Sequence, residues 1–91
     1  MLEEARVATI SQQVKTQAFI DEAVLMSLRA AYPDIHFTYC LDDDIVTGKP
    51  VLSEEKFNVY LVDGREHCLC LTNDYDVATG IVIAEIIEDE D

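Results

Sequence analysis

Basic residues are scarce in this sequence. The 91 residues include 6 lysines and arginines against 19 aspartates and glutamates, which gives a formal net charge of −13 at pH 7. A surface of that sign repels phosphate backbones, so we expect no direct binding of nucleic acid. The same field attracts a basic protein surface and speeds its encounter with the chain.

Long apolar runs are also missing. No stretch approaches the ~18 apolar residues of a membrane span, and the start MLEEARVA has neither the basic beginning nor the apolar centre of a secretory signal. We therefore expect a cytoplasmic protein with no membrane partner. A chain of this length forms one domain, residues 1–91, with an acidic and frayed tail at 88–91. A single small core leaves no deep cleft, which argues against an enzyme.

Cysteine is too scarce for a disulfide framework, because three is an odd number and no export signal is present. Cys40, Cys68 and Cys70 are instead expected to be reduced. On extended strands Cys40 shares a face with His36, and Cys68 shares one with Cys70, with His67 opposite. Thiolate and imidazole suit soft metals, so Cys40, Cys68, Cys70 and His36 are candidate metal ligands. The simpler interpretation is that the thiols pack as small hydrophobes in acidic surroundings that raise their pKa, with no bound cofactor.

Glycine and proline are absent from residues 1–32, where good helix formers dominate, so the sequence predicts helix there. A polar stretch near residues 15–18 interrupts the apolar stripe, and Thr16 is a candidate cap for a new helix. Two helices are therefore favoured over one. Pro33 is expected to end the second helix, because it pushes Tyr32 away from helical geometry.

The second part of the chain predicts strands. Residues 35–41, 57–62 and 66–72 alternate in the period of a half-buried strand. β-Branched residues predict a fourth strand at 81–87, with a short helix over 76–85 as the alternative. The fold class expected is therefore α+β, with two N-terminal helices packed on one face of a three- or four-stranded antiparallel sheet.

The turn between the second and third predicted strands decides where two thiols point. An Asp-Gly pair at residues 63–64 provides the glycine that a tight hairpin needs. A two-residue turn there would place Cys68 opposite Val59, with Cys70 in the core as well. A three-residue loop over 62–64 would turn both cysteines outward. The sequence leaves both registers open.

An acidic run, Asp42 to Asp44, follows the first predicted strand. These adjacent carboxylates lack the spacing, the central glycine and the closing glutamate of a calcium-binding EF-hand loop. A solvated turn is the plainer interpretation of Asp42, Asp43 and Asp44. The functional interpretation is a patch that docks lysine and arginine side chains of a partner, with Tyr39 and Tyr60 adding contact area.

A family resemblance rests on four segments, YPDIHFTYCLDDD, GKPV, FNVYLVDGREHCLCLT and ATGIVIAE. Together they resemble an uncharacterised family of small acidic proteins associated with nitrogen-fixation gene neighbourhoods in diazotrophic bacteria. The resemblance covers about residues 32–85. It implies a setting, a cytoplasmic accessory to nitrogenase or to its cofactor assembly or electron supply, and it transfers no catalytic residue.

The leading hypothesis is thus a non-enzymatic acidic module that binds a protein partner with a basic surface. One alternative is a small soft-metal or cofactor carrier that uses the cysteine and histidine cluster. The other is an acidic inhibitor that imitates nucleic acid.

Overall fold

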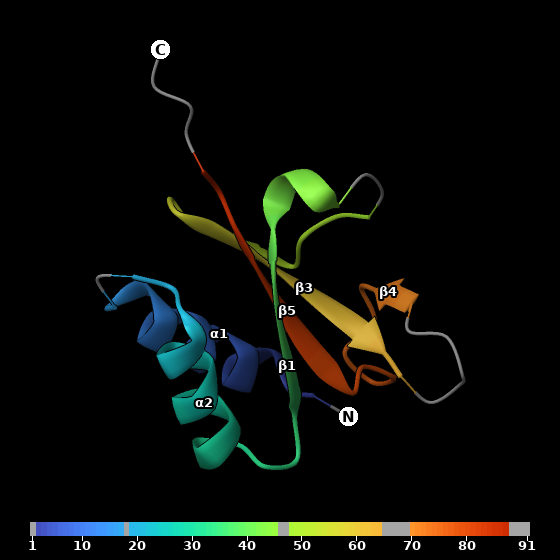
Figure 1. Ribbon diagram of the computed structural model, residues 1–91. Coiled ribbons are helices and arrows are strands. Elements are labelled where there is room, and N and C mark those ends of the chain that lie inside the picture. Colours follow the sequence, from blue (N-terminus) through green and yellow to red (C-terminus); the bar gives the residue numbers. More distant parts are fainter. Residues whose placement is uncertain (1, 18, 46–47, 65–69, 88–91) are drawn as a thin grey trace.

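The computed structural model describes residues 2–17, 19–45, 48–64 and 70–87 (Figure 1). Its elements confirm the predicted α+β class. In no helix of this described part is there an apolar stretch long enough to cross a membrane. The elements are the helices α1 (Glu4–Lys15) and α2 (Glu22–Ala31), the strands β1 (His36–Leu41), β2 (Leu52–Ser53), β3 (Phe57–Asp63), β4 (Cys70–Thr72) and β5 (Gly80–Glu85), and the 3-10 turn η1 (Asp42–Asp44) after β1.

The two predicted helices are present, but the second begins later than expected. The Asp21 carboxylate accepts a hydrogen bond of 3.1 Å from the Val24 amide and so caps α2. The prediction that Thr16 caps this helix is wrong, because its hydroxyl donates to the Gln13 carbonyl at 2.8 Å and closes α1. The end of α2 at Ala31, two residues before Pro33, agrees with the predicted stop.

The sheet has five strands in the order β1-β5-β3-β2, with β4 also paired to β3. β3 and β5 are antiparallel, whereas β1 and β5 are parallel (Figure 1). The prediction of a purely antiparallel sheet is therefore wrong. The chain between β1 and β5 carries three other strands, which gives it the length that a parallel crossover requires.

β5 is the central strand, and all its residues except Glu85 are buried. Neighbouring strands and covered faces surround it on every side, which explains its unbroken apolar sequence. The predicted strand over 81–87 is thus confirmed in its main part, and the alternative helix is wrong.

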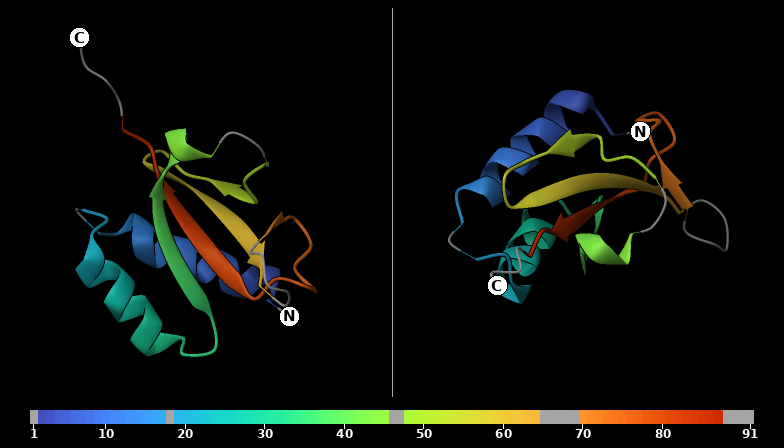
Figure 2. Two further views of the ribbon diagram at one scale, coloured as in Figure 1. Left: turned by 45° about the vertical axis from the view of Figure 1, so that its right-hand side comes forward. Right: turned by 90° about the horizontal axis from the view of Figure 1, so that it is seen from above.

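Both helices lie on one side of the sheet, which Figure 2 shows from above. The larger core cluster fills the space between the helices and this face, and its largest fully buried side chains include Phe57, Ile10 and Leu25. A smaller cluster lies on the opposite face, where the residue after η1, Ile45, packs on the sheet. The buried members of the smaller cluster are Tyr60, Val62, Val82 and Ala84, with Cys40 and Ile45 partly buried against them.

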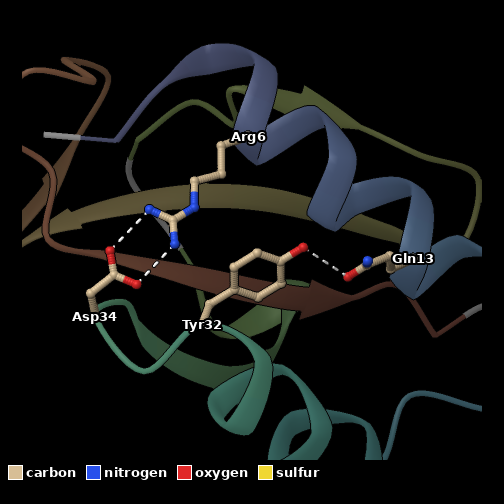
Figure 3. A network of polar contacts seen from close by, with 4 residues as sticks. All are labelled: Arg6, Gln13, Tyr32 and Asp34. Carbon is tan, nitrogen blue, oxygen red and sulfur yellow. Dashed lines mark hydrogen bonds and ion pairs between the residues drawn. The ribbon is translucent and has the colours of Figure 1, made fainter.

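Polar contacts tie α1 to the segment that follows α2 (Figure 3). Arg6 donates two hydrogen bonds to Asp34, of 2.9 and 2.8 Å, and its guanidinium lies 5.2 Å from the centre of the Tyr32 ring. The Tyr32 hydroxyl lies 3.3 Å from the side-chain oxygen of Gln13, to which it donates. The Tyr32 ring therefore lies between the two helices and fixes the entry of the chain into β1.

Candidate functional site

The parallel pairing of β1 with β5 gathers carboxylates at one end of the sheet. Leu41 and Glu85, the last residues of these strands, are paired, and Glu85 also pairs with Phe57, the first residue of β3. The acidic turn after β1, the end of β5 and the turn before β3 therefore meet in the upper part of Figure 1. We call this the acidic end, and its described carboxylates are Asp42, Asp43, Asp44, Glu54, Glu55 and Glu85.

Asp42 anchors the turn to the sheet. Its Oδ1 accepts hydrogen bonds from the Asn58 amide at 2.9 Å and from the Tyr60 hydroxyl at 3.2 Å. The Ile45 amide closes η1 onto the Asp42 carbonyl at 3.1 Å. Asp43 and Asp44 are exposed. The predicted acidic run therefore consists of one structural carboxylate, Asp42, and two carboxylates that face solvent.

The two tyrosines predicted at this surface lie in different environments. Tyr60 is 6% exposed and supports η1 from beneath, and burial together with Asp42 raises its pKa. Tyr39 is 37% exposed, and its hydroxyl donates to Glu85. That bond, with smaller effects of burial and of charge, raises the pKa of Tyr39 to about 12. Leu41, 38% exposed on the same face of β1, extends the apolar surface beside Tyr39.

Some of the charge at the acidic end is neutralised internally. Glu54 accepts a hydrogen bond of 3.1 Å from the buried Ser11 hydroxyl and lies 3.5 Å from the Lys15 ammonium. Lys56 is the other cation nearby, and its carbonyl accepts from the amide of Ile86 at 2.8 Å. Among the described residues, six carboxylates against two ammonium groups leave this end strongly negative, so a basic surface is the complement it fits.

The hairpin adopts neither predicted register. Asp63 pairs with Cys70, whereas Val59 pairs with Leu52 of β2. β2 and β4 share one edge of β3, so no return strand can run along its whole length. Cys68 and His67 lie in residues 65–69, outside the described part of the chain.

The other predicted metal ligands are not brought together. His36 and Cys40 share a face of β1 but lie about 13 Å apart along it. Cys40 is level with Asn58 of β3, whereas Cys70 is level with Asp63, about 17 Å further along that strand. Within the described residues, no three histidine, cysteine or acidic side chains form a group that could hold a metal.

The predicted effect of the acidic surroundings on thiol acidity is confirmed at Cys40. Burial raises the pKa of its thiol most, and the carboxylates of Asp44 and Asp42 raise it further. A thiol of raised pKa is a poor nucleophile and a poor ligand at neutral pH. Cys70, in contrast, is exposed, so it does not fill the core as the simpler interpretation held.

A family model matches residues 9–86, which include most of α1 and every other element. The chain belongs to the family of unknown function DUF6129. The match begins inside α1, so it extends further toward the N-terminus than the resemblance found from residue 32 onward. No curated protein and no solved structure matches the chain. The family description names no activity.

Proposed function

We propose that this protein is a non-enzymatic accessory module that binds a partner with a basic surface through its acidic end. One observation carries the proposal. The parallel pairing of β1 and β5 brings the exposed Asp43 and Asp44 to the same end of the sheet as Glu85, where the exposed side chains of Tyr39 and Leu41 lie on the face of β1 opposite the acidic turn. Charge and apolar contact area thus occur together at one end of the β1 edge, where one partner can reach both.

The two kinds of residue have different roles in this proposal. Asp43 and Asp44 project into solvent, where their field raises the rate of encounter with a positive surface. The ring of Tyr39 is held by its hydrogen bond to Glu85, so less side-chain freedom is lost when a partner covers it. Asp42 is engaged with the sheet and keeps the turn in place.

We further propose that the partner belongs to nitrogenase, its assembly or its electron supply. The support is the resemblance of residues 32–85 to proteins of nitrogen-fixation gene neighbourhoods. The carrier hypothesis has weaker support, because His36, Cys40 and Cys70 do not converge.

The test compares capture of partners by the full chain and by two variants of equal charge. Asp43→Asn with Asp44→Asn removes two charges from the acidic end. Glu3→Gln with Asp76→Asn removes two exposed charges from the opposite end of the sheet. Each is used as bait in extracts of diazotrophic cells grown with and without fixed nitrogen, and the retained proteins are identified by mass spectrometry.

We expect a basic nitrogen-fixation protein that the wild type and the Glu3/Asp76 variant retain and that the Asp43/Asp44 variant loses. Its association rate constant should fall about tenfold or more between roughly 20 and 200 mM salt, because screening shortens the reach of the field. An association rate that does not change with salt would refute the steering role. If the bait instead retains a DNA-binding protein and contacts its nucleic-acid site, the result would favour the alternative hypothesis of an acidic inhibitor that imitates nucleic acid.

A further inference from the structure

The six residues of β1 form a terminal strand of the sheet, and no other described strand pairs with its outer edge. β1 pairs with β5 along its whole length, from His36 to Leu41. The opposite edge of the sheet differs, because β3 is covered there by the short strands β2 and β4. The longest unpaired backbone edge among the described strands is therefore that of β1, and such an edge is a template for another strand.

The backbone groups that face outward can be assigned from two hydrogen bonds. The His36 amide donates to the Thr79 carbonyl at 3.3 Å, so the backbone amide and carbonyl of His36 point toward β5. Alternate residues of a strand direct their amide and carbonyl to opposite sides, so Phe37, Tyr39 and Leu41 face outward. The Arg29 guanidinium confirms this, because it donates to the Phe37 carbonyl at 3.1 Å from outside the sheet.

Arg29 therefore closes one end of the edge and leaves the other open. The outward amides of Tyr39 and Leu41 make no hydrogen bond to another described residue, whereas the carbonyl of Leu41 begins the turn η1. The side chains of the same two residues are 37% and 38% exposed. The open part of the edge thus lies directly beside the acidic end.

We propose that this edge takes an extended basic segment of the partner as an additional strand, antiparallel to β1. The proposal rests on the proposed function, since it assigns how the basic partner is held. Antiparallel pairing is the more stable arrangement and would place the N-terminal residues of the segment beside Asp42–Asp44. The segment that fits this edge therefore begins with lysine or arginine and continues with residues that favour β-strands.

A second copy of the chain fits this edge poorly. Two β1 strands paired antiparallel about Tyr39 would bring Asp44 of one copy opposite Asp34 of the other. Each copy carries a net charge of −13, so self-association would also bring two strongly negative molecules together. The charge therefore favours a basic partner segment over a dimer.

Leu41 allows the backbone contribution to be tested separately from the side chain. Its φ of −85° lies close to the range that proline adopts, and its amide faces away from β5. Leu41→Pro therefore removes an outward amide without breaking the ladder to β5. Leu41→Ala is the matched control, because it keeps the amide and removes most of the same side chain. Both variants are checked for the wild-type circular dichroism and urea midpoint.

The probe is a display library of peptides that carry two lysines or arginines followed by about six randomised residues, selected on the full chain. Selected peptides are resynthesised with and without N-methylation of alternate backbone amides. We expect Leu41→Pro and N-methylation each to weaken binding about tenfold or more, and Leu41→Ala to weaken it by a smaller factor. In amide hydrogen exchange, the bound peptide should slow exchange at Tyr39 and Leu41, while Thr38 and Cys40 are protected with or without it.

Two results would overturn strand addition: no peptide is enriched above background, or Leu41→Pro and the N-methylated peptides bind as the originals do. Neither result bears on the salt-dependent capture of a partner by the Asp43 and Asp44 carboxylates. That proposal is tested separately, by the bait variants and by the dependence of the association rate on salt. If Leu41→Pro does not fold, the N-methylated peptides still decide the question on the wild-type chain.

Discussion

Gly80→Ala is expected to destabilise the protein strongly, because Gly80 lies where three strands approach closely. Gly80 begins β5 and pairs with His36 of β1 on one side and Val62 of β3 on the other. A Cβ atom at this position would lie 2.8 Å from the His36 carbonyl oxygen, 2.9 Å from Cγ2 of Val62 and 3.0 Å from Cβ of His36. The Val62 side chain can rotate away, but the His36 backbone cannot move without disturbing the β1–β5 ladder.

The magnitude follows from what must move. Overpacking of a core costs about 1–3 kcal/mol, and a collision with backbone belongs in the upper half, about 2–3 kcal/mol. A domain of 91 residues has a free energy of unfolding of roughly 5–14 kcal/mol. At about 4–8 °C per kcal/mol, the melting temperature should fall by roughly 8–24 °C.

Urea unfolding of Gly80→Ala, Val62→Ala and the double variant measures this cost and assigns it. If the His36 backbone dominates the clash, the two effects should add within about 0.5 kcal/mol. If the Val62 methyl dominates, the double variant should be more stable than the sum of the single effects. A loss below about 0.5 kcal/mol for Gly80→Ala, the range of an ordinary surface change, would refute the close approach of β1 and β5.

Three further predictions concern single carboxylates and one phenol. Asp42→Ala should lower the free energy of unfolding by about 1–3 kcal/mol in urea titrations, because it leaves a buried hydroxyl and an amide of β3 without their acceptor, whereas Asp43→Ala should change it by less than about 0.5 kcal/mol. The guanidinium of Arg6 lowers the pKa of Asp34 below 3.8, so the stability from this pair is present above that pH and lost as the pH falls through the lower folded value. The urea midpoint of Asp34→Asn should therefore lie below that of wild type at neutral pH and converge with it in acid, and a constant difference would contradict the linkage. Ultraviolet titration should show one phenol that ionises near pH 12 in wild type and at a lower pH in Glu85→Gln, whereas an unchanged titration would contradict the bond to Glu85.

The local elements were largely predictable from the sequence because their signals lie within each segment. Alternation over residues 35–41 and the β-branched run after Gly80 predicted strands that the structure contains. Pro33 predicted the end of α2 for a steric reason that no tertiary contact alters. The cap of α2 was missed, although Asp21 has a side chain suited to that role.

Strand partners were not predictable in the same way. A strand pattern records which faces are covered, but it does not record which neighbour forms hydrogen bonds at each edge. The Asp63-Gly64 signal favoured a tight hairpin, yet β2 pairs with Asn58 and Val59 on the β3 edge that such a hairpin would use. The parallel neighbour of β1 lies about 40 residues away in the sequence, and the meeting of Asp42–Asp44 with Glu85 depends on that pairing.

The central position of β5 also has a consequence for how the sheet assembles. β1 and β3 have no hydrogen-bonded contact except through β5, and β5 comes last in the order of elements. During synthesis, β1 must therefore wait for β5 before it can join the sheet formed by β2, β3 and β4. Pairings over such long sequence separations slow folding. Until β5 is made, β1 has no neighbouring strand, and the step that completes the sheet is the insertion of β5 between β1 and β3.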